Sequence, residues 1–264
     1  MPHFVDHIVI RVDDLDRDTD LFSEMFGFEP YAYKLDHGFI AHSVYRIGTV
    51  DIELLKAGKK SDFSPYLYGV SFGSDEDAWS IIDDLSDMEI RHSLPSSSAI
   101  SLSTGREEWQ NIIMADLLDN PPPIPMAMHR DTISKRLFAR VSDFAFGSAA
   151  VKKALLTDYG DAMAFFTIYK NQTSALRQEA EKRLIEAGGG IFGLSKLHTV
   201  NIEAAESYTK WLSFSGALFN PEELTIERGA NNHLLSTTWH SSTVEQIKRI
   251  SFGTAEFVIA PTPS

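Results

Sequence analysis

Two ionisable side chains interrupt aliphatic segments in the first part of the chain. His7 lies in the stretch 6–15, and Glu53 lies in the stretch 50–55. Side chains alternate across a β-strand, so each ionisable residue shares a face with every second neighbour, while the aliphatic residues between them point the other way. We therefore expect the two polar faces to line one hollow. An imidazole and a carboxylate there suit a divalent metal such as Fe, Mn, Co, Ni or Zn.

The segments around these residues predict a βαβββ unit. A strand over 7–12 leads into a helix over 16–26, which has acidic residues in its first turn and an apolar stripe. Gly27 ends this helix. Three further strands are predicted at 29–35, 41–47 and 50–55.

The order of a strand followed by a helix recurs further along the chain. Residues 66–72 predict a strand and 75–85 a helix. Weaker strand candidates follow at 99–102, 109–114 and 124–129. A third copy begins with a strand over 197–202 and a helix over 204–214, and His198 stands there where His7 stands in the first copy. The closing segments predict strands at 224–227, 233–238 and 255–260 and a short helix at 244–250.

These repeats divide the chain into four parts. Between the second and third copies, the segment from about 134 to 190 includes a predicted helix over 174–187 and reads as a helical insertion. The predicted organisation is a first module over 1–60, a second and degenerate module paired with it over 61–133, a helical insertion or linker over 134–192, and a C-terminal partial module over 193–264.

Composition excludes several classes of protein. The chain has 264 residues, 43% of them hydrophobic, which is ordinary for a folded protein. A formal net charge of −13 argues against nucleic-acid binding, which needs clustered Lys and Arg. There is no long apolar run for a membrane helix, no signal-peptide pattern and no cysteine. We expect a cytoplasmic protein that binds neither nucleic acid nor membrane.

The opening unit resembles the vicinal oxygen chelate superfamily, and more narrowly the glyoxalase-like domain proteins. The resemblance is carried by the stretch 6–15, by Phe-Gly-Phe at 26–28 and by Ile-Glu-Leu-Leu at 52–55. It covers about residues 3–58, with weaker echoes at 66–130 and 196–216. It implies an α+β fold in which repeated βαβββ modules form curved mixed or antiparallel sheets.

The resemblance also implies a divalent metal chelated by oxygens of the substrate. In such folds the first strand of a module offers a His or Gln and its last strand a Glu, which here are His7 and Glu53. The second module has Gly69 near the position of His7, but its predicted last strand ends in His129, which is the first candidate for a third ligand.

A competing arrangement pairs the first copy with the third. It would use His198 together with either Glu256 or His233. The predicted short helix before Glu256 departs from the expected module, so this pairing ranks second.

The expected function is a metal-dependent glyoxalase- or dioxygenase-like enzyme, that is a lyase, an isomerase or a dioxygenase, acting on a small oxygen-containing substrate. Glu53 would be catalytic as a proton acceptor, and Arg11, His42 and Arg46 would contact the substrate.

The alternative is a metal-free protein that sequesters a small molecule in the same hollow. A scaffold without a working site is a third hypothesis. A homodimer is left open, because a second chain could complete the site.

Overall fold

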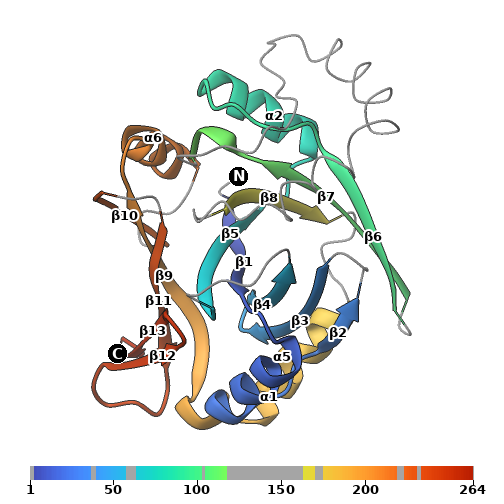
Figure 1. The fold of residues 1–264 in the computed structure, drawn as a ribbon, viewed down its shortest axis with the longest axis vertical. Coiled ribbons are helices and arrows are strands. Elements are labelled where there is room, and N and C mark those ends of the chain that lie inside the picture. Colours follow the sequence, from blue (N-terminus) through green and yellow to red (C-terminus); the bar gives the residue numbers. More distant parts are fainter. Residues whose placement is uncertain are drawn as a thin grey trace.

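The computed structural model describes residues 3–36, 40–57, 64–102, 105–117, 163–169, 175–218, 223–230 and 233–263. These residues form two β-sheets with helices packed beside them (Figure 1). The larger sheet has eight strands in the order β2-β3-β4-β1-β5-β8-β7-β6, and the smaller has five in the order β10-β9-β11-β13-β12.

The elements have the following bounds. The larger sheet contains β1 (Phe4–Arg11), β2 (Ala32–Asp36), β3 (Ile40–Ile47), β4 (Val50–Ala57), β5 (Tyr66–Gly73), β6 (Ser96–Leu102), β7 (Gly105–Ile113) and β8 (Met163–Tyr169). The smaller sheet contains β9 (Leu194–Ala204), β10 (Leu224–Arg228), β11 (His233–Ser241), β12 (Lys248–Phe252) and β13 (Ala255–Pro261). The helices are α1 (Leu15–Phe26), α2 (Ala78–Asp87), α5 (Ala175–Glu186) and α6 (Tyr208–Leu218), with short 3₁₀ turns η1 (Ala115–Leu117) and η3 (Gly190–Phe192).

Two βαβββ modules share the larger sheet. The first runs β1-α1-β2-β3-β4 and the second β5-α2-β6-β7-β8. Within each module the first strand pairs in parallel with the last, β1 with β4 and β5 with β8. The two modules join where β1 pairs antiparallel with β5. The predicted α+β fold of βαβββ modules in curved mixed sheets is thereby confirmed.

The last strand of the second module differs from the sequence prediction. It is β8, from Met163 to Tyr169, which lies between β5 and β7. These residues were predicted to belong to the helical insertion, although their run of aromatic and β-branched residues is typical of a buried strand. The predicted strand over 124–129, which carries His129, falls in 118–162 and lies outside the described residues.

The smaller sheet repeats the central pairing of the larger one with fewer strands. β9 pairs in parallel with β10, which follows it through α6, and antiparallel with β11. The prediction of a helix over 244–250 was wrong, because β12 begins at Lys248 and pairs antiparallel with β13. Phe252 faces Ala255 across a tight turn, and this cross-strand pairing overrides the local helical pattern.

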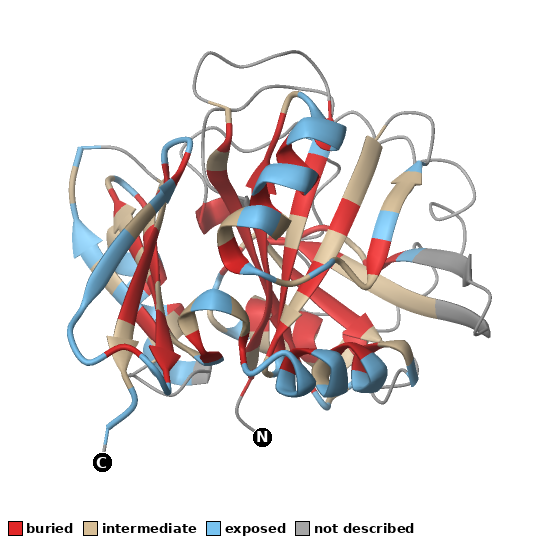
Figure 2. Ribbon diagram, turned by 90° about the horizontal axis from the view of Figure 1, so that it is seen from below, coloured by how far each residue is buried: buried red, intermediate tan, exposed pale blue. Residues whose placement is uncertain are grey.

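An aromatic core joins α1 to the smaller sheet. Phe22 and Phe26 of α1 are fully buried. The Phe22 ring lies 5.3 Å from that of Phe252 and 5.9 Å from that of Phe257. Burying a phenylalanine contributes about 1.5–3 kcal/mol. Figure 2 shows the outer faces of the helices exposed, and the central strands β1, β4 and β5 are buried over most of their length.

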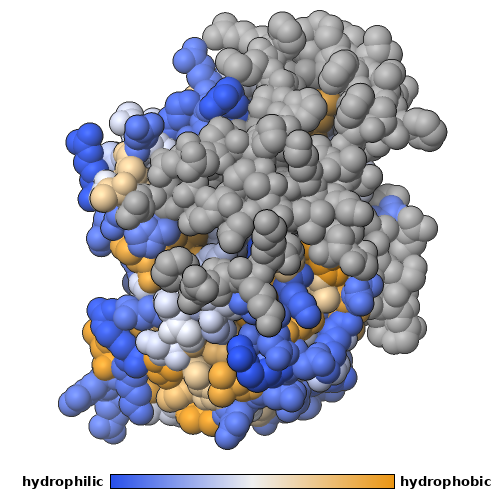
Figure 3. Space-filling model, viewed as in Figure 1, coloured by the Kyte–Doolittle hydropathy of each residue, from blue (hydrophilic) through white to orange (hydrophobic). Residues whose placement is uncertain are grey.

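Hydrophilic and apolar side chains are both visible on the one face drawn in Figure 3. On the face seen in Figure 3, hydrophilic side chains surround smaller apolar patches. This agrees with the net charge of −13. Among the described residues, no helix combines the length and the apolar character needed to cross a membrane.

The turn between α5 and β9 offers a test of how α5 is joined to the rest. Gly188 and Gly190 both have positive φ, +62° and +70°, but a Cβ on Gly190 would lie 2.1 Å from the carbonyl oxygen of Phe26, whereas one on Gly188 would meet nothing within 4 Å. We expect Gly188→Ala to cost about 1–2 kcal/mol from backbone strain. Gly190→Ala should cost roughly 1–3 kcal/mol more from the clash. Denaturant unfolding measures both, and equal losses would contradict this packing.

A buried carboxylate ties the second module to α6 and predicts a pH dependence. Asp116 accepts hydrogen bonds from Lys210 Nζ at 2.6 Å and from the Arg91 backbone N–H at 2.8 Å. Burial would raise the pKa of Asp116, but Lys210 and Arg91 lower it below the ordinary 3.8. Its ionised form therefore stabilises the fold above pH 3.8, and this stabilisation is lost as the pH falls through the lower folded pKa.

Asp116→Asn should accordingly cost about 1–3 kcal/mol at pH 6. The difference from the unmodified protein should shrink on going to pH 3, as measured by urea unfolding at both pH values. Asp16→Asn, at an exposed carboxylate paired with Lys34, is the control and should change little at either pH. A constant difference for Asp116→Asn across this range would contradict the lowered pKa.

Candidate functional site

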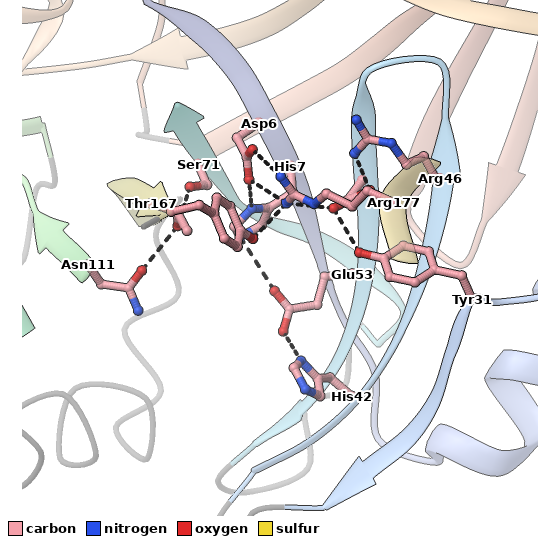
Figure 4. A network of polar contacts seen from close by, with 12 residues as sticks. Asp6, His7, Tyr31, His42, Arg46, Glu53, Ser71, Asn111, Thr167 and Arg177 are labelled. Atoms are coloured by element: carbon pink, nitrogen blue, oxygen red, sulfur yellow. Dashed lines mark hydrogen bonds and ion pairs between the residues drawn. The ribbon is translucent and has the colours of Figure 1, made fainter. Parts of the chain in front are cut away.

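His7 and Glu53 meet on one side of the larger sheet. β1 and β4 are neighbours, with His7 opposite Asp51 and Val9 opposite Glu53. The alternation that was read from the sequence therefore puts both side chains on the same face. The Nε2 atom of His7 lies 3.6 Å from Oε2 of Glu53, and the two side chains are 10% and 17% exposed (Figure 4).

Each of these two groups is held by a further side chain. Asp6 accepts a hydrogen bond from Nδ1–H of His7 at 2.8 Å. Adjacent residues of a regular strand point to opposite faces, but the pairing of β1 with β5 shifts between Val5 and His7, and this bulge lets Asp6 reach the ring of its neighbour. On the other oxygen of Glu53, Nδ1 of His42 lies 2.5 Å away.

The surrounding charges favour the ionised forms of the first pair. Burial would raise the pKa of Asp6, but Arg177 and His7 hold it well below its ordinary value. Burial would lower the pKa of His7, but the hydrogen bond and charge of Asp6, together with the charges of Glu53 and Asp51, raise it above 6.5. Asp6 accepts the hydrogen bond of Nδ1–H, and the opposite ring nitrogen, Nε2, is directed at Glu53.

A positive charge between Nε2 of His7 and the Glu53 carboxylate would satisfy both. A proton can supply it, and so can a divalent cation. Two ligands at about 2.1 Å from one ion lie roughly 3.0–3.6 Å apart, and ligating His and carboxylate groups are usually oriented by further hydrogen bonds, as Asp6 and His42 do here. The pair thus fits a cation as two of its ligands. Within the described ranges no group of three or more His, Cys, Asp or Glu is arranged to hold a metal ion.

A charged network adjoins the pair. Asp51 accepts hydrogen bonds from Arg46 Nη1 at 2.7 Å and from Tyr31 Oη at 2.9 Å, and its Oδ2 forms an ion pair with Arg177 Nη2 at 2.7 Å. Burial and the charge of Asp51 raise the pKa of Tyr31 well above its ordinary value, which keeps its hydroxyl protonated as a donor. Arg46, which was predicted to contact the substrate, is therefore bound to Asp51.

The second module faces this cluster with uncharged residues. The registers make Gly69 and Phe165 the counterparts of His7 and Glu53, since Gly69 lies opposite Met163 and Ser71 opposite Phe165. The Phe165 ring stands edge-on to the His7 ring, with centroids 5.2 Å apart.

Beside Phe165, three neutral polar groups form a chain. Ser71 Oγ–H donates to Thr167 Oγ1 at 2.8 Å, and that hydroxyl donates to Asn111 Oδ1 at 3.1 Å. Figure 4 shows this chain on the far side of His7 from Glu53 and His42. The two halves of the site therefore differ in charge.

An apolar wall continues the same face toward the other end of β1. It is a buried cluster separate from the main core, with partly buried neighbours, and consists of Val9, Ile40, Leu55, Ala57, Tyr66, Tyr68 and Phe165. Arg11 lies at its end, 1% exposed, with its guanidinium 5.5 Å from the centre of the Tyr68 ring. Of the residues predicted to contact the substrate, Arg11 thus lies beside apolar surface and His42 beside Glu53.

The other predicted ligands lie elsewhere. His129 is outside the described residues. His198 is on β9 of the smaller sheet, where its ring lies 4.6 Å from that of His240. Glu256 is bound to Arg249 on the neighbouring strand, and His233 begins β11. The competing arrangement, in which the first copy pairs with the third, is not found, because β1 pairs with β5.

Sequence reasoning missed three members of the site. Asp51 shares the face of Glu53 by alternation and Asp6 is next to His7 in sequence, but neither was predicted as a site residue. In a regular strand Asp6 would point away from His7. Arg177 belongs to a hydrophilic helix 171 residues away from Asp6. No local signal distinguishes it from the other charged residues of that helix.

Comparisons with known proteins bear on the fold. No family model matches the sequence, and neither does any curated protein. Among solved structures, a hypothetical protein from Staphylococcus aureus aligns over 98% of this chain and 100% of its own at 12% identity, with a TM-score of 0.62. A methylmalonyl-CoA epimerase in complex with methylmalonyl-CoA aligns over 66% of this chain and 99% of its own at 12% identity and a TM-score of 0.38. The epimerase from Mycobacterium tuberculosis aligns over 62% and 87% at 10% identity and a TM-score of 0.36.

The order and pairing of the strands define the class. Two βαβββ modules joined through their first strands are the fold that the resemblance to the vicinal oxygen chelate superfamily implied, and this fold is confirmed. At sequence identities of 10–12%, the comparisons support the fold but not a function.

Removing the buried arginine tests the network. Arg177→Met would leave Asp6 and Asp51 without their shared cation in a site where both carboxylates are only 3% exposed. We expect a loss of about 3–5 kcal/mol in the free energy of unfolding. Arg183→Met, on the same helix at a 67% exposed side chain paired with Glu179, should cost less than about 1 kcal/mol. Guanidinium unfolding of both variants provides the measurement, and a similar loss for the two would contradict the network.

Proposed function

We propose that this protein is a metal-dependent enzyme of the vicinal oxygen chelate type that acts on a small oxygen-containing molecule. One observation carries the proposal. His7 Nε2 and Glu53 Oε2 converge at the separation of two ligands of one ion, 3.6 Å, and each belongs to a side chain oriented by another, Asp6 and His42. His129 stays a proposed third ligand, although the place opposite Ser71 in the last strand of the second module is taken by Phe165. Substrate oxygens would complete the shell.

In this proposal the protein side chains divide the work. A divalent ion bound by His7 and Glu53 would supply Lewis acidity toward a substrate oxygen. Glu53 would accept a proton from the substrate carbon next to that oxygen. One oxygen of its carboxylate faces His7, and the second oxygen is held by His42. A proton transfer of this kind corresponds to a lyase or isomerase, which we prefer to a dioxygenase.

The apolar wall would hold the rest of the substrate. Val9, Leu55 and Tyr68 are buried on the same face as the ionisable pair. Apolar surface beside a few polar groups is the usual make-up of a small-molecule site, and it would also keep bulk water from the reacting atoms. Arg11 would contact an anionic or oxygen-bearing end of the substrate.

A metal-free binding protein is the second candidate. It is favoured by the second module, where Gly69 and Phe165 stand at the positions of His7 and Glu53 and offer no ligand. In that case a proton would lie between His7 and Glu53, and Phe165 would pack against an aromatic or apolar ligand.

Metal loading separates the two candidates. Untagged protein is incubated with equal amounts of Mn²⁺, Ni²⁺ and Zn²⁺, freed of excess metal by gel filtration and analysed by mass spectrometry of the elements. We expect about one bound metal ion per chain in the unmodified protein. In His7→Ala and in Glu53→Gln the bound metal should fall to near zero, because each variant removes one ligand from a small coordination shell. His198→Ala is the matched control, since this histidine lies on the smaller sheet, and it should load like the unmodified protein.

The enzyme proposal would be overturned if the unmodified protein held no metal after loading, which would favour the binding protein. It would also be overturned if both His7→Ala and Glu53→Gln bound as much metal as the unmodified protein. Loss of metal in His198→Ala alone would move the metal site to the smaller sheet.

A further inference from the structure

Helix α5 reaches the site through a single buried arginine. The helix is hydrophilic, and its buried residues are Arg177, Ala180 and Leu184. Long charged side chains are almost never fully buried unless they are paired. Arg177 is only 9% exposed, so its charge must be satisfied inside the protein.

Three groups surround the Arg177 guanidinium. Its Nη1 and Nη2 atoms donate to the two oxygens of Asp6 at 3.0 and 3.1 Å. Nη2 also lies 2.7 Å from Asp51 Oδ2 and 2.6 Å from Tyr169 Oη, and the guanidinium stacks 4.0 Å from the centre of the Tyr169 ring. A bidentate fork of this kind fixes both the place and the plane of the carboxylate that it binds.

The carboxylate fixed in this way is the one that orients His7. Oδ2 of Asp6 accepts from Nδ1–H of His7 at 2.8 Å, and the opposite ring nitrogen then points at Glu53. We infer that Arg177 is a positioning residue for the site, holding Asp6 so that His7 presents Nε2 to Glu53. The inference deepens the proposed function and rests on it for the bound metal, whereas the orientation of the ring can be tested without metal.

The geometry calls for arginine and not merely for a positive charge. Lysine would keep the charge between Asp6 and Asp51 but would lose the planar fork and the stacking on Tyr169. Arg177→Lys therefore separates positioning from neutralisation. The matched control is Arg183→Lys, because Arg183 lies on the same helix with an exposed side chain bound to Glu179.

Two readouts follow His7 in these variants. In metal-free protein, the Nδ1–H resonance of His7 is identified in nitrogen–proton NMR spectra by its absence in His7→Ala. We expect this proton to be protected from exchange with water in the unmodified protein and in Arg183→Lys. In Arg177→Lys its resonance should be lost or shifted. Titration calorimetry with Ni²⁺ should give an affinity roughly 10–100-fold weaker for Arg177→Lys and unchanged for Arg183→Lys.

The outcomes distinguish this inference from the proposed function. If the unmodified protein binds no Ni²⁺ but the Nδ1–H resonance behaves as expected, the metal-dependent function fails and the positioning role stands. If Ni²⁺ binds and Arg177→Lys changes neither readout, the positioning role is overturned and the function stands. Should Arg177→Lys not fold, Tyr169→Phe removes the 2.6 Å contact alone, and the absence of any change in its Nδ1–H resonance would overturn the inference.

Discussion

The site depends on two buried carboxylates, Asp6 and Asp51, that share the guanidinium of Arg177, while Asp51 also binds Arg46. Asp6 and Asp51 lie on adjacent strands, and each would repel the other and be poorly solvated if Arg177 were absent. Such a cluster contributes little net stability compared with an apolar core, but it is costly to break. The main effect of the cluster is on orientation, because the hydrogen bonds and ion pairs among Asp6, Asp51 and Arg177 fix how these three side chains lie. His7 takes its orientation from that arrangement.

The two βαβββ modules of the larger sheet have the same strand order but differ in chemistry. The first copy carries the ionisable groups, His7, His42 and Glu53, while the second offers Gly69 and Phe165 at corresponding places. A ligand between the modules would meet charge on one side and neutral or aromatic surface on the other. For the proposed function, this asymmetry would favour a substrate with one polar, oxygen-bearing end over one with two equivalent ends.

Short-range pattern predicted the first module well and the later part of the chain less well. The shared face of His7 and Glu53 follows from alternation on two strands, and the helix end at Gly27 follows from its left-handed backbone. Strand β8 was missed because its partners, β5 and β7, lie far away in sequence, and β12 because pairing with β13 outweighed a helical pattern. Arg177 was not predictable, because burial of a charged side chain depends on partners that only the folded chain brings near.

The contact between Asp6 and Arg177 also sets an order of events for a growing chain. The two residues are separated by 171 positions, so the first module is synthesised long before the arginine that it requires. During that interval Asp6 and Asp51 lack Arg177, although Asp51 can already pair with Arg46 of the same module. Closing so long a loop is slow relative to forming local hairpins. The network around Asp6 is therefore completed only after α5 has left the ribosome, while the smaller sheet, which follows α5 in the chain, is still to form.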